Sequence, residues 1–418
     1  MTDAGIQRPL PRAWLTVALL WPVAMLNYLD RQMLATMGLS LRADIAELQS
    51  AEKFGDLMAI FLVVYAICSP IGGWVADRVN RKWLIVLSLA VWSSVTLLMG
   101  HAHNFPELYW LRAGMGISEA LYIPAGLALI ADFHRGSTRS LAVGLHLSGL
   151  YMGQALGGIG GWIAQDVSWR AAFGSCGWFG VGYALVLVCF LREADRHSPA
   201  FNAANETGQP SSINWPGFAL LLLCFMLPSF PGWAVKNWLP TLLHDRFAFD
   251  QKSSGLFATI FASGAGFLGV ILGGRLSDAW FRRNPRGRTY MSAIGLLITV
   301  PALVGIGQAN TAAVALACIA LYGLAFGFFD TNNMPILCEL APPRFRATGY
   351  GLINFAGISA GAIVTPLLGR LKDGGVPLGT GLAICAAPAF LAAALMYFLG
   401  KVGTRRPLLR GEIKAAAV

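Results

Sequence analysis

The strongest constraint on this chain is a series of apolar segments, each about 20 residues long, that recur along nearly its whole length. A segment of that length and polarity can cross the hydrocarbon core of a bilayer as a helix. We count roughly twelve such segments, separated by short polar breaks. The sequence therefore predicts an all-α integral membrane protein with twelve transmembrane helices.

Charged side chains are scarce in this sequence. Asp, Glu, Lys and Arg make up 12% of the 418 residues, against about 25% in soluble domains. This scarcity disfavours a water-soluble enzyme, and we expect the lipid bilayer to be the main surrounding. A net charge of +10 would suit nucleic acid only if the bases were clustered on a soluble fold. No such cluster is visible, so we expect no nucleic-acid partner.

A long polar stretch divides the chain into two parts. Residues 192–214 are rich in Ser, Asn, Pro and charges, a composition typical of a flexible linker. We predict a six-helix bundle at 1–191, a cytoplasmic linker at 192–214, and a second six-helix bundle with a short cytoplasmic tail at 215–418. Most of the 31 Lys and Arg residues fall in loops on one side, which places both termini in the cytoplasm. We expect a multi-pass protein of the plasma (inner) membrane.

Two similar polar loops indicate an internal repeat. The loop from Gly73 to Lys82 reads GWVADRVNRK, and the loop from Gly274 to Arg283 repeats its Gly, Asp and basic pair. Two homologous halves are the economical explanation. In the first loop an Asp can cap a neighbouring helix and pair with Arg, which predicts a latch. The gating residues that we predict are Gly73, Asp77, Arg78, Arg81, Asp278 and Arg282.

With these loops the chain resembles the major facilitator superfamily over essentially its whole length, although Ala279 replaces the Arg in the second copy. The resemblance implies two pseudo-symmetric six-helix bundles. The fifth helix carries four glycines at a spacing of four, which form one smooth face: Gly149, Gly153, Gly157 and Gly161. This face is either a moving contact between the halves or static helix packing.

Ionisable residues inside the apolar segments are candidates for function, because burying a charge in lipid is costly. The first helix contains Asp30 and Arg31, and the fourth contains Arg112 and Glu119, whose spacing of seven places them on one face. The seventh helix contains Lys236, and the tenth contains an Asp. The charges of the first and fourth helices could simply neutralise one another. Alternatively, the excess of one cation in the outer half of the membrane binds an anionic substrate.

Two motifs carry a closer resemblance. NYLDR at 27–31 and R-x6-E at 112–119 resemble the anion:cation symporter branch, whose members carry sugar acids and other organic anions with protons. They also resemble the spinster branch of lipid-linked transporters. The resemblance implies that Asp30 and Glu119 couple protons and that Arg31 or Arg112 holds the substrate carboxylate. The candidate substrate-binding residues are Arg31, Arg112, Lys236, Tyr28, Asn237 and Asn354.

We therefore expect a secondary active transporter, not an enzyme, that moves a small organic anion by proton-coupled symport with alternating access. The alternative is a spinster-like transporter of a lipid or another amphipathic molecule. We expect a monomer with the proton as coupling ion, no other cofactor and no metal site. The seven cysteines show no close pairing, and the GxGxxG pattern at 264–269 lies inside an apolar segment without the preceding strand that nucleotide binding needs.

Overall fold

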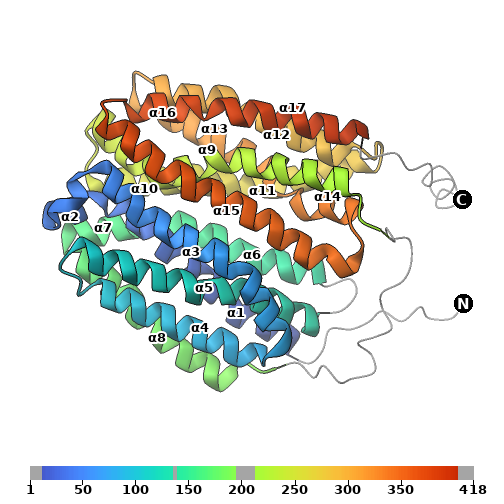
Figure 1. Cartoon of the computed structure of the whole chain (residues 1–418), viewed down its shortest axis with the longest axis horizontal. Coiled ribbons are helices and arrows are strands. Elements are labelled where there is room, and N and C mark those ends of the chain that lie inside the picture. Colours follow the sequence, from blue (N-terminus) through green and yellow to red (C-terminus); the bar gives the residue numbers. More distant parts are fainter. Residues whose placement is uncertain (1–11, 135–138, 194–211, 403–418) are drawn as a thin grey trace, which may run out of the picture.

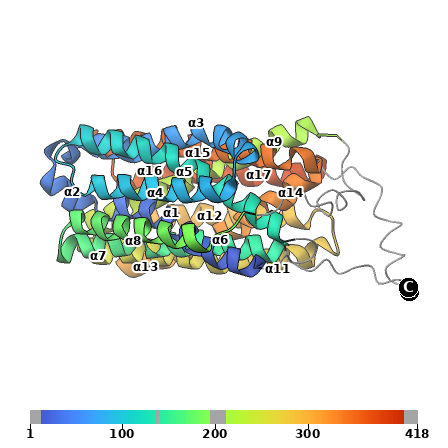
Figure 2. The same cartoon turned by 90° about the horizontal axis from the view of Figure 1, so that it is seen from below.

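The computed structural model describes residues 12–134, 139–193 and 212–402, and the regular elements in these ranges are all helical. The helices run along one common axis in both views (Figures 1 and 2). The N-terminal half contains α1 (Ala13–Thr36), α2 (Gly38–Asp44), the 3₁₀ helix η1 (Ala46–Gln49), α3 (Ala51–Arg78), α4 (Arg81–Met99), α5 (Phe105–Phe133), α6 (Arg139–Leu156), α7 (Gly158–Asp166) and α8 (Trp169–Phe190).

The C-terminal half begins after the predicted linker, most of which lies outside the described residues. It contains α9 (Trp215–Phe247), α10 (Gln251–Thr259), the π-helix η4 (Ile260–Gly264), α11 (Ala265–Phe281), α12 (Gly287–Gln308), α13 (Ala312–Asp330), α14 (Asn333–Leu340), α15 (Pro343–Asp373), α16 (Leu378–Ile384) and α17 (Ala386–Val402). In Figure 1 the blue-to-green first half and the yellow-to-red second half lie side by side.

The predicted membrane architecture is confirmed. Within the described ranges, 11 helical segments are long and apolar enough to cross a bilayer, and the pair α6 and α7 occupies the position of the remaining predicted span. Large apolar side chains cover the outside of the bundle, where a soluble protein would carry charge. Those more than half exposed include Ile67, Ile71, Leu87, Phe190 and Phe398.

The two halves are joined by hydrogen bonds at one end of the bundle, which we name the Gln251 end. Gln251 of α10 donates from Nε2 to Ser40 Oγ (2.8 Å) and to the Gly161 carbonyl (3.2 Å). Asp373 of α15 accepts from the hydroxyl of Ser50 (2.7 Å) and from two backbone amides at the start of α3 (both 2.9 Å). The C-terminal half thus caps a helix of the N-terminal half.

A third contact at this end also crosses between the halves. Gln165 of α7 donates from Nε2 to a carboxylate oxygen of Asp250, which precedes α10, at 2.8 Å. Hydrogen bonds from Ser253 and Gln165 hold the pKa of Asp250 below its ordinary value. A depressed pKa means that this contact is stable above the ordinary pKa and weakens only as the pH falls through the depressed one.

The opposite end, which we name the Arg81 end, carries two equivalent ion-pair sites. Arg81 pairs with Asp132 at the end of α5. In the second half, Arg288 pairs with Asp278 (3.0 Å) and with Glu339 (3.1 Å). Each of these pairs, among the residues described, joins helices of the same half.

The ion pairs show which residue of the second half takes the place of Arg81. Arg282, which aligns with Arg81 in the repeated loop, is exposed at the end of α11. Arg288, at the start of α12, makes the pair that Arg81 makes in the first half. Asp278 takes part in an ion pair with Arg288, and the gating roles of Asp278 and Arg282 stay predictions.

The four-residue glycine spacing serves mainly packing within the first half. A Cβ atom at Gly149, Gly153 or Gly157 would meet α1 rather than the C-terminal half. Only the far part of this face, at Gly161 and the neighbouring Gly158, approaches α10. The fifth span also breaks between α6 and α7, where the hydroxyl of Thr36 donates to the Gly157 carbonyl at 2.9 Å.

This close packing gives a first prediction. A Cβ at Gly153 would overlap the Met25 carbonyl oxygen, so we expect Gly153→Ala to lower the free energy of unfolding by about 1–3 kcal/mol. The matched control is Gly182→Ala on α8, where the Cβ meets nothing within 4 Å and the change should be neutral or slightly stabilising. Thermal unfolding of both purified variants measures the difference. Equal midpoints would show that α1 and α6 can separate without cost.

Candidate functional site

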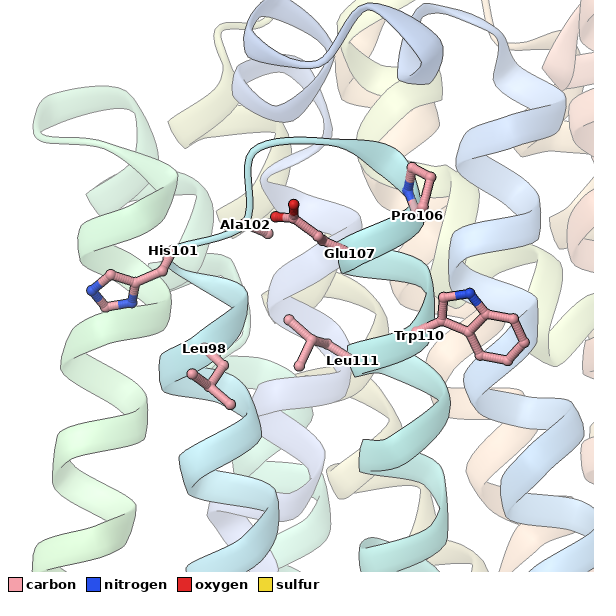
Figure 3. A pocket seen from close by; sticks show the side chains of 7 residues that line it. All are labelled: Leu98, His101, Ala102, Pro106, Glu107, Trp110 and Leu111. Carbon is pink, nitrogen blue, oxygen red and sulfur yellow. The ribbon is translucent and has the colours of Figure 1, made fainter.

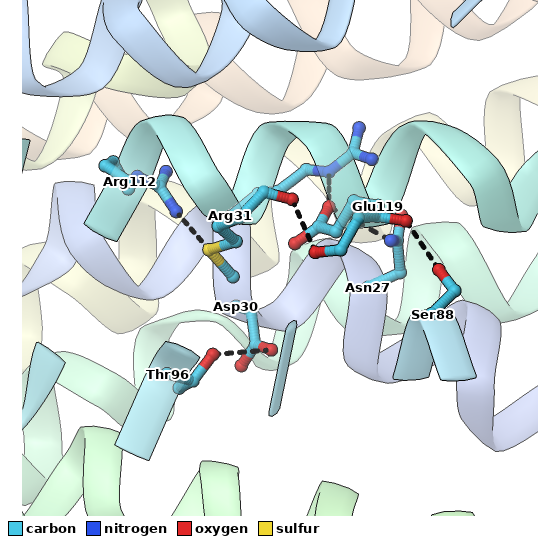
Figure 4. Close-up of polar contacts among 9 residues, drawn as sticks. Asn27, Asp30, Arg31, Ser88, Thr96, Arg112 and Glu119 are labelled. Atoms are coloured by element: carbon cyan, nitrogen blue, oxygen red, sulfur yellow. Dashed lines mark hydrogen bonds and ion pairs between the residues drawn. The ribbon is translucent and has the colours of Figure 1, made fainter. Parts of the chain in front are cut away.

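A buried ion pair between α1 and α5 forms the centre of the candidate site (Figure 4). Arg31 donates from Nε to Glu119 Oε2 at 2.6 Å, and Asn27 donates from Nδ2 to the same oxygen at 3.0 Å. Asn27 and Arg31 are four residues apart, so both face α5 from one side of α1. The Glu119 side chain is fully buried, and that of Arg31 is 7% exposed.

Aromatic rings surround the two arginines of the site. The guanidinium carbon of Arg31 lies 4.7 Å from the ring centroid of Tyr28, 4.9 Å from that of Phe61 and 4.4 Å from that of Tyr65. Arg112 lies 4.8 Å from the same Phe61 ring. Cation–π attraction therefore holds both cations next to one side chain of α3, despite their mutual repulsion.

Arg112 and Glu119 lie on one helix, as predicted, but they do not pair. Arg112 Nη1 contacts Met115 Sδ at 3.2 Å, and among the described residues Arg112 forms no ion pair. Its side chain is nonetheless buried, with 3% of the residue exposed. A buried guanidinium without a carboxylate partner is unusual, because leaving such a charge unpaired is costly.

Asp30 points away from the ion pair, because adjacent residues of a helix project about 100° apart. Figure 4 shows it on the side of Thr96. The Thr96 hydroxyl donates to one carboxylate oxygen at 3.4 Å, and the Cys176 thiol donates to the other at 2.8 Å. The structure thus separates the two predicted proton-coupling residues, one beside a cation and one among neutral donors.

Several polar atoms in this cluster are buried without a hydrogen-bond partner. They are donors on both arginines and acceptors on the other two side chains: Arg31 Nη2, Arg112 Nε, Glu119 Oε1 and Asn27 Oδ1. An unsatisfied buried group costs about 1–3 kcal/mol. The cluster can therefore bind an acceptor group at the arginines and a proton at the free oxygen of Glu119.

The remaining predicted substrate residues lie on helices of the second half. Lys236 places its ammonium 5.0 Å from the Trp233 ring, and its backbone carbonyl accepts from Gln32 of α1 at 2.9 Å. Asn237 is buried and donates to Thr365 Oγ1 at 2.9 Å, so it joins α9 to α15. Asn354 is half-buried in α15. Lys236 is thus the residue of this group that lies at the contact with α1.

The predicted gating residues lie at the Arg81 end, away from this cluster. Arg78 is exposed and stacks on Trp74, with its guanidinium carbon 4.1 Å from the ring. Gly73 is half-buried, with nothing within 4 Å of the position of a Cβ. The side chain of Asp77 lies outside the described part of the structure.

One acidic residue of the site was noticed in the sequence but not assigned a role. Asp330, at the end of α13, accepts a hydrogen bond from the Tyr151 hydroxyl of α6, which crosses between the halves. It also accepts from Asn333 Nδ2 at 2.9 Å. Its charge inside an apolar segment was the available signal, whereas nothing in the sequence indicated Tyr151.

A surface recess of about 600 Å³ lies elsewhere, between the end of α4 and the start of α5 (Figure 3). It shares no lining residue with the buried cluster. Its lining is Leu98, His101, Ala102, Pro106, Glu107, Trp110 and Leu111. Within the described ranges, no group of three or more His, Cys, Asp or Glu side chains could hold a metal ion.

Comparisons with known proteins match one family over most of the chain. Residues 20–366 match the Major Facilitator Superfamily. An MFS-type efflux pump of Mycolicibacterium smegmatis is 25% identical over 424 residues, covering 98% of this chain and 97% of the relative. A probable L-galactonate transporter of Escherichia coli is 24% identical over 402 residues, covering 91% and 88%.

A solved structure shares the fold. It is a bacterial homologue of the human lysosomal transporter spinster, in an inward-facing and occupied conformation. The TM-score is 0.78 at 18% sequence identity, and the match covers 95% of this chain and 99% of that chain. The resemblance seen in the sequence is confirmed, with a galactonate transporter and a spinster homologue among the matches.

The buried ion pair gives a second prediction. Arg31→Met leaves Glu119 buried without its cation, so we expect a loss of about 3–5 kcal/mol in the free energy of unfolding. Adding Glu119→Gln to that variant should recover most of the loss. The control is Arg370→Met, which removes an exposed pair with Glu52 and should cost less than about 1 kcal/mol. Thermal unfolding of the purified variants measures these changes. Equal losses of stability in Arg31→Met and Arg370→Met would contradict the central role of the ion pair between Arg31 and Glu119.

Proposed function

Because the chain belongs to the Major Facilitator Superfamily, we propose that it is a secondary active transporter that carries a small organic anion across the membrane together with protons. The supporting observation is the pair of buried arginines, each with an unpartnered N–H group, beside a buried glutamate with an unpartnered oxygen. An anion satisfies the donors and a proton satisfies the acceptor. The coupling ion and the substrate thus have separate places in one cluster.

Substrate recognition rests on the arginines and the rings around them. A carboxylate accepts hydrogen bonds from a guanidinium with well-matched geometry, and Arg31 Nη2 and Arg112 Nε are available. The rings of Tyr28, Phe61 and Tyr65 form an amphipathic wall for the rest of the molecule. A sugar acid or another carboxylate of similar size fits this chemistry, and the L-galactonate transporter among the relatives supports that class.

Coupling follows from competition for Arg31. When a substrate carboxylate binds Arg31, Glu119 loses part of the attraction that stabilises its negative charge. A buried carboxylate without a cation is more stable in the protonated form. Anion binding and protonation of Glu119 therefore favour each other, which is the condition for symport. Asp30, held by neutral donors, is the other carboxylate of the N-terminal half that can take a proton.

Alternating access follows from the contacts between the halves. We propose that the Arg81 end faces the cytoplasm of a cell bounded by its plasma membrane, because basic loops gather on that side. The first residues of α1 and the last residues of α17 lie at the Arg81 end (Figure 1). Hydrogen bonds join the halves at the Gln251 end, and in this proposal they close the side that faces away from the cytoplasm. A monomer in the bilayer, with the proton as coupling ion and no nucleic-acid partner, suffices for this cycle.

A spinster-like lipid transporter is the competing function. The structural match to a spinster homologue and the aromatic cluster of Phe225, Phe326 and Phe329, with centroid distances of 5.1 and 5.6 Å, are compatible with an amphipathic substrate. A thermal-shift panel of sugar acids, aromatic acids and lysophospholipids separates the two. Stabilisation by carboxylates that disappears in Arg31→Ala favours the anion, and stabilisation by lysophospholipids alone favours the lipid.

The proton site gives a third prediction. In proteoliposomes with an inward proton gradient, Glu119→Gln should abolish uphill accumulation of L-galactonate but retain its exchange across the membrane, because a glutamine cannot release a proton. Labelled uptake and counterflow measure the two processes. The control is Glu107→Gln, a change of an exposed residue on the same helix, which should retain both. Undiminished accumulation by Glu119→Gln would remove this residue from the proton path.

A further inference from the structure

Asp330 is a carboxylate inside a membrane span whose partners are uncharged. The Tyr151 hydroxyl and Asn333 Nδ2 donate to its two oxygens, and in the described part of the chain no Lys or Arg forms an ion pair with it. Glu119, by contrast, is held by Arg31. An ionised carboxylate at this depth costs at least about 2.5–3.5 kcal/mol on insertion scales, and protonation removes that cost.

The partners of Asp330 tolerate both of its protonation states. A tyrosine hydroxyl can donate to a carboxylate or accept from a carboxylic acid, and an asparagine NH₂ donates to a carbonyl oxygen in either case. Asp330 can therefore gain a proton from water and return it to water without leaving a buried group unpaired. An arginine partner, which only donates, favours the ionised form, so Glu119 takes a proton only when an anion competes for Arg31.

The surroundings connect Asp330 to the central cluster. Tyr28 interacts electrostatically with both Glu119 and Asp330. Tyr350 of α15, which is 37% exposed, also lies near Asp330 and Tyr28. Lys236 of α9 is the cation whose charge interacts with Asp330. Tyr28, Tyr350 and Lys236, from three different helices, thus all interact electrostatically with Asp330.

The charge balance of the membrane interior changes once Asp330 is included. The sequence count left one cation in excess, because it placed Lys236 with the outer residues and omitted this acid. The fold brings Asp330 within electrostatic reach of Lys236, so the cations Arg31, Arg112 and Lys236 face an equal number of carboxylates. Binding of a monoanion then requires one proton for neutrality, and a second proton makes the loaded carrier positive.

We propose that Asp330 is a second proton-carrying carboxylate, located in the C-terminal half, so that two protons accompany each monoanion and one net positive charge crosses per cycle. The proposal rests on the transport function proposed above. The hydrogen bond from Tyr151 places this proton at the boundary between the halves, where their relative movement exposes it to either side. In this proposal Glu119 and Asp330 carry the two protons, one in each half, and Asp30 keeps its charge through the cycle.

The test compares two driving forces in proteoliposomes, with L-galactonate as the probe. A diffusion potential of about 100 mV without a pH gradient should let the wild type accumulate the probe about 50-fold, since one net charge moved across it is worth about 2.3 kcal/mol. Asp330→Asn should lose this voltage-driven accumulation while a pH gradient still drives uptake. Asp166→Asn, the same change at an exposed residue of α7, keeps Asp330 and should remain voltage-driven, and Asp330→Glu should restore the voltage response.

The outcomes separate this proposal from the transport function itself. Wild-type uptake that follows the pH gradient but ignores voltage overturns the second proton and leaves the symport intact. The same holds if Asp330→Asn responds to voltage as the wild type does. If neither gradient drives uptake by the wild type, the symport proposal fails.

A measurement that needs no substrate tests the proposal even if Asp330→Asn does not transport. Infrared difference spectra against pH should show a titrating carboxylic acid band that is present in the wild type and Asp166→Asn and missing in Asp330→Asn. Spectra without any band that depends on Asp330 would overturn the proposal, because the carboxyl group would then not change its protonation state.

Discussion

The ion pair between Arg31 and Glu119 is the interaction on which the rest of the site depends. A charge surrounded by lipid-facing helices needs a counter-charge, and this pair supplies it within the first half. With Arg31 fixed, its guanidinium orders three aromatic rings, and Arg112 is left without a carboxylate. The second arginine is thus buried without an ion pair among the described residues, which is the basis of the proposed anion site.

The second constraint is how the halves meet. Hydrogen bonds through Gln251 and Asp373 close one end of the bundle, and the contact of Tyr151 with Asp330 joins the halves closer to the centre. At the Arg81 end the ion pairs seen among the described residues join helices of the same half. A conformational cycle can therefore exchange one set of contacts for another while each six-helix unit keeps its own packing, which is consistent with rigid-body movement.

Much of the fold was predictable because hydropathy is a local property. Each apolar segment indicates its own helix, and the spacing of Arg112 and Glu119 correctly placed them on one face. The ion-pair partner of Glu119 was not predictable in the same way, because Glu119 pairs with Arg31 of α1 and not with Arg112 of its own helix. Arg288 rather than Arg282 makes the ion pair that corresponds to that of Arg81, because the loop between the two helices differs in length between the halves. The glycine face of α6 packs against α1, a contact that depends on how the two helices are placed.

The sequence by itself indicated the apolar helical segments and the few positions where a charge enters the membrane, because each depends on residue type along a short stretch. Only the tertiary structure decided which of these charges touch. That choice depends on the rotation of every helix about its axis and on its neighbours, so Asp30 was turned toward Thr96, Asn237 toward Thr365, and Asp330 toward a tyrosine of the other half.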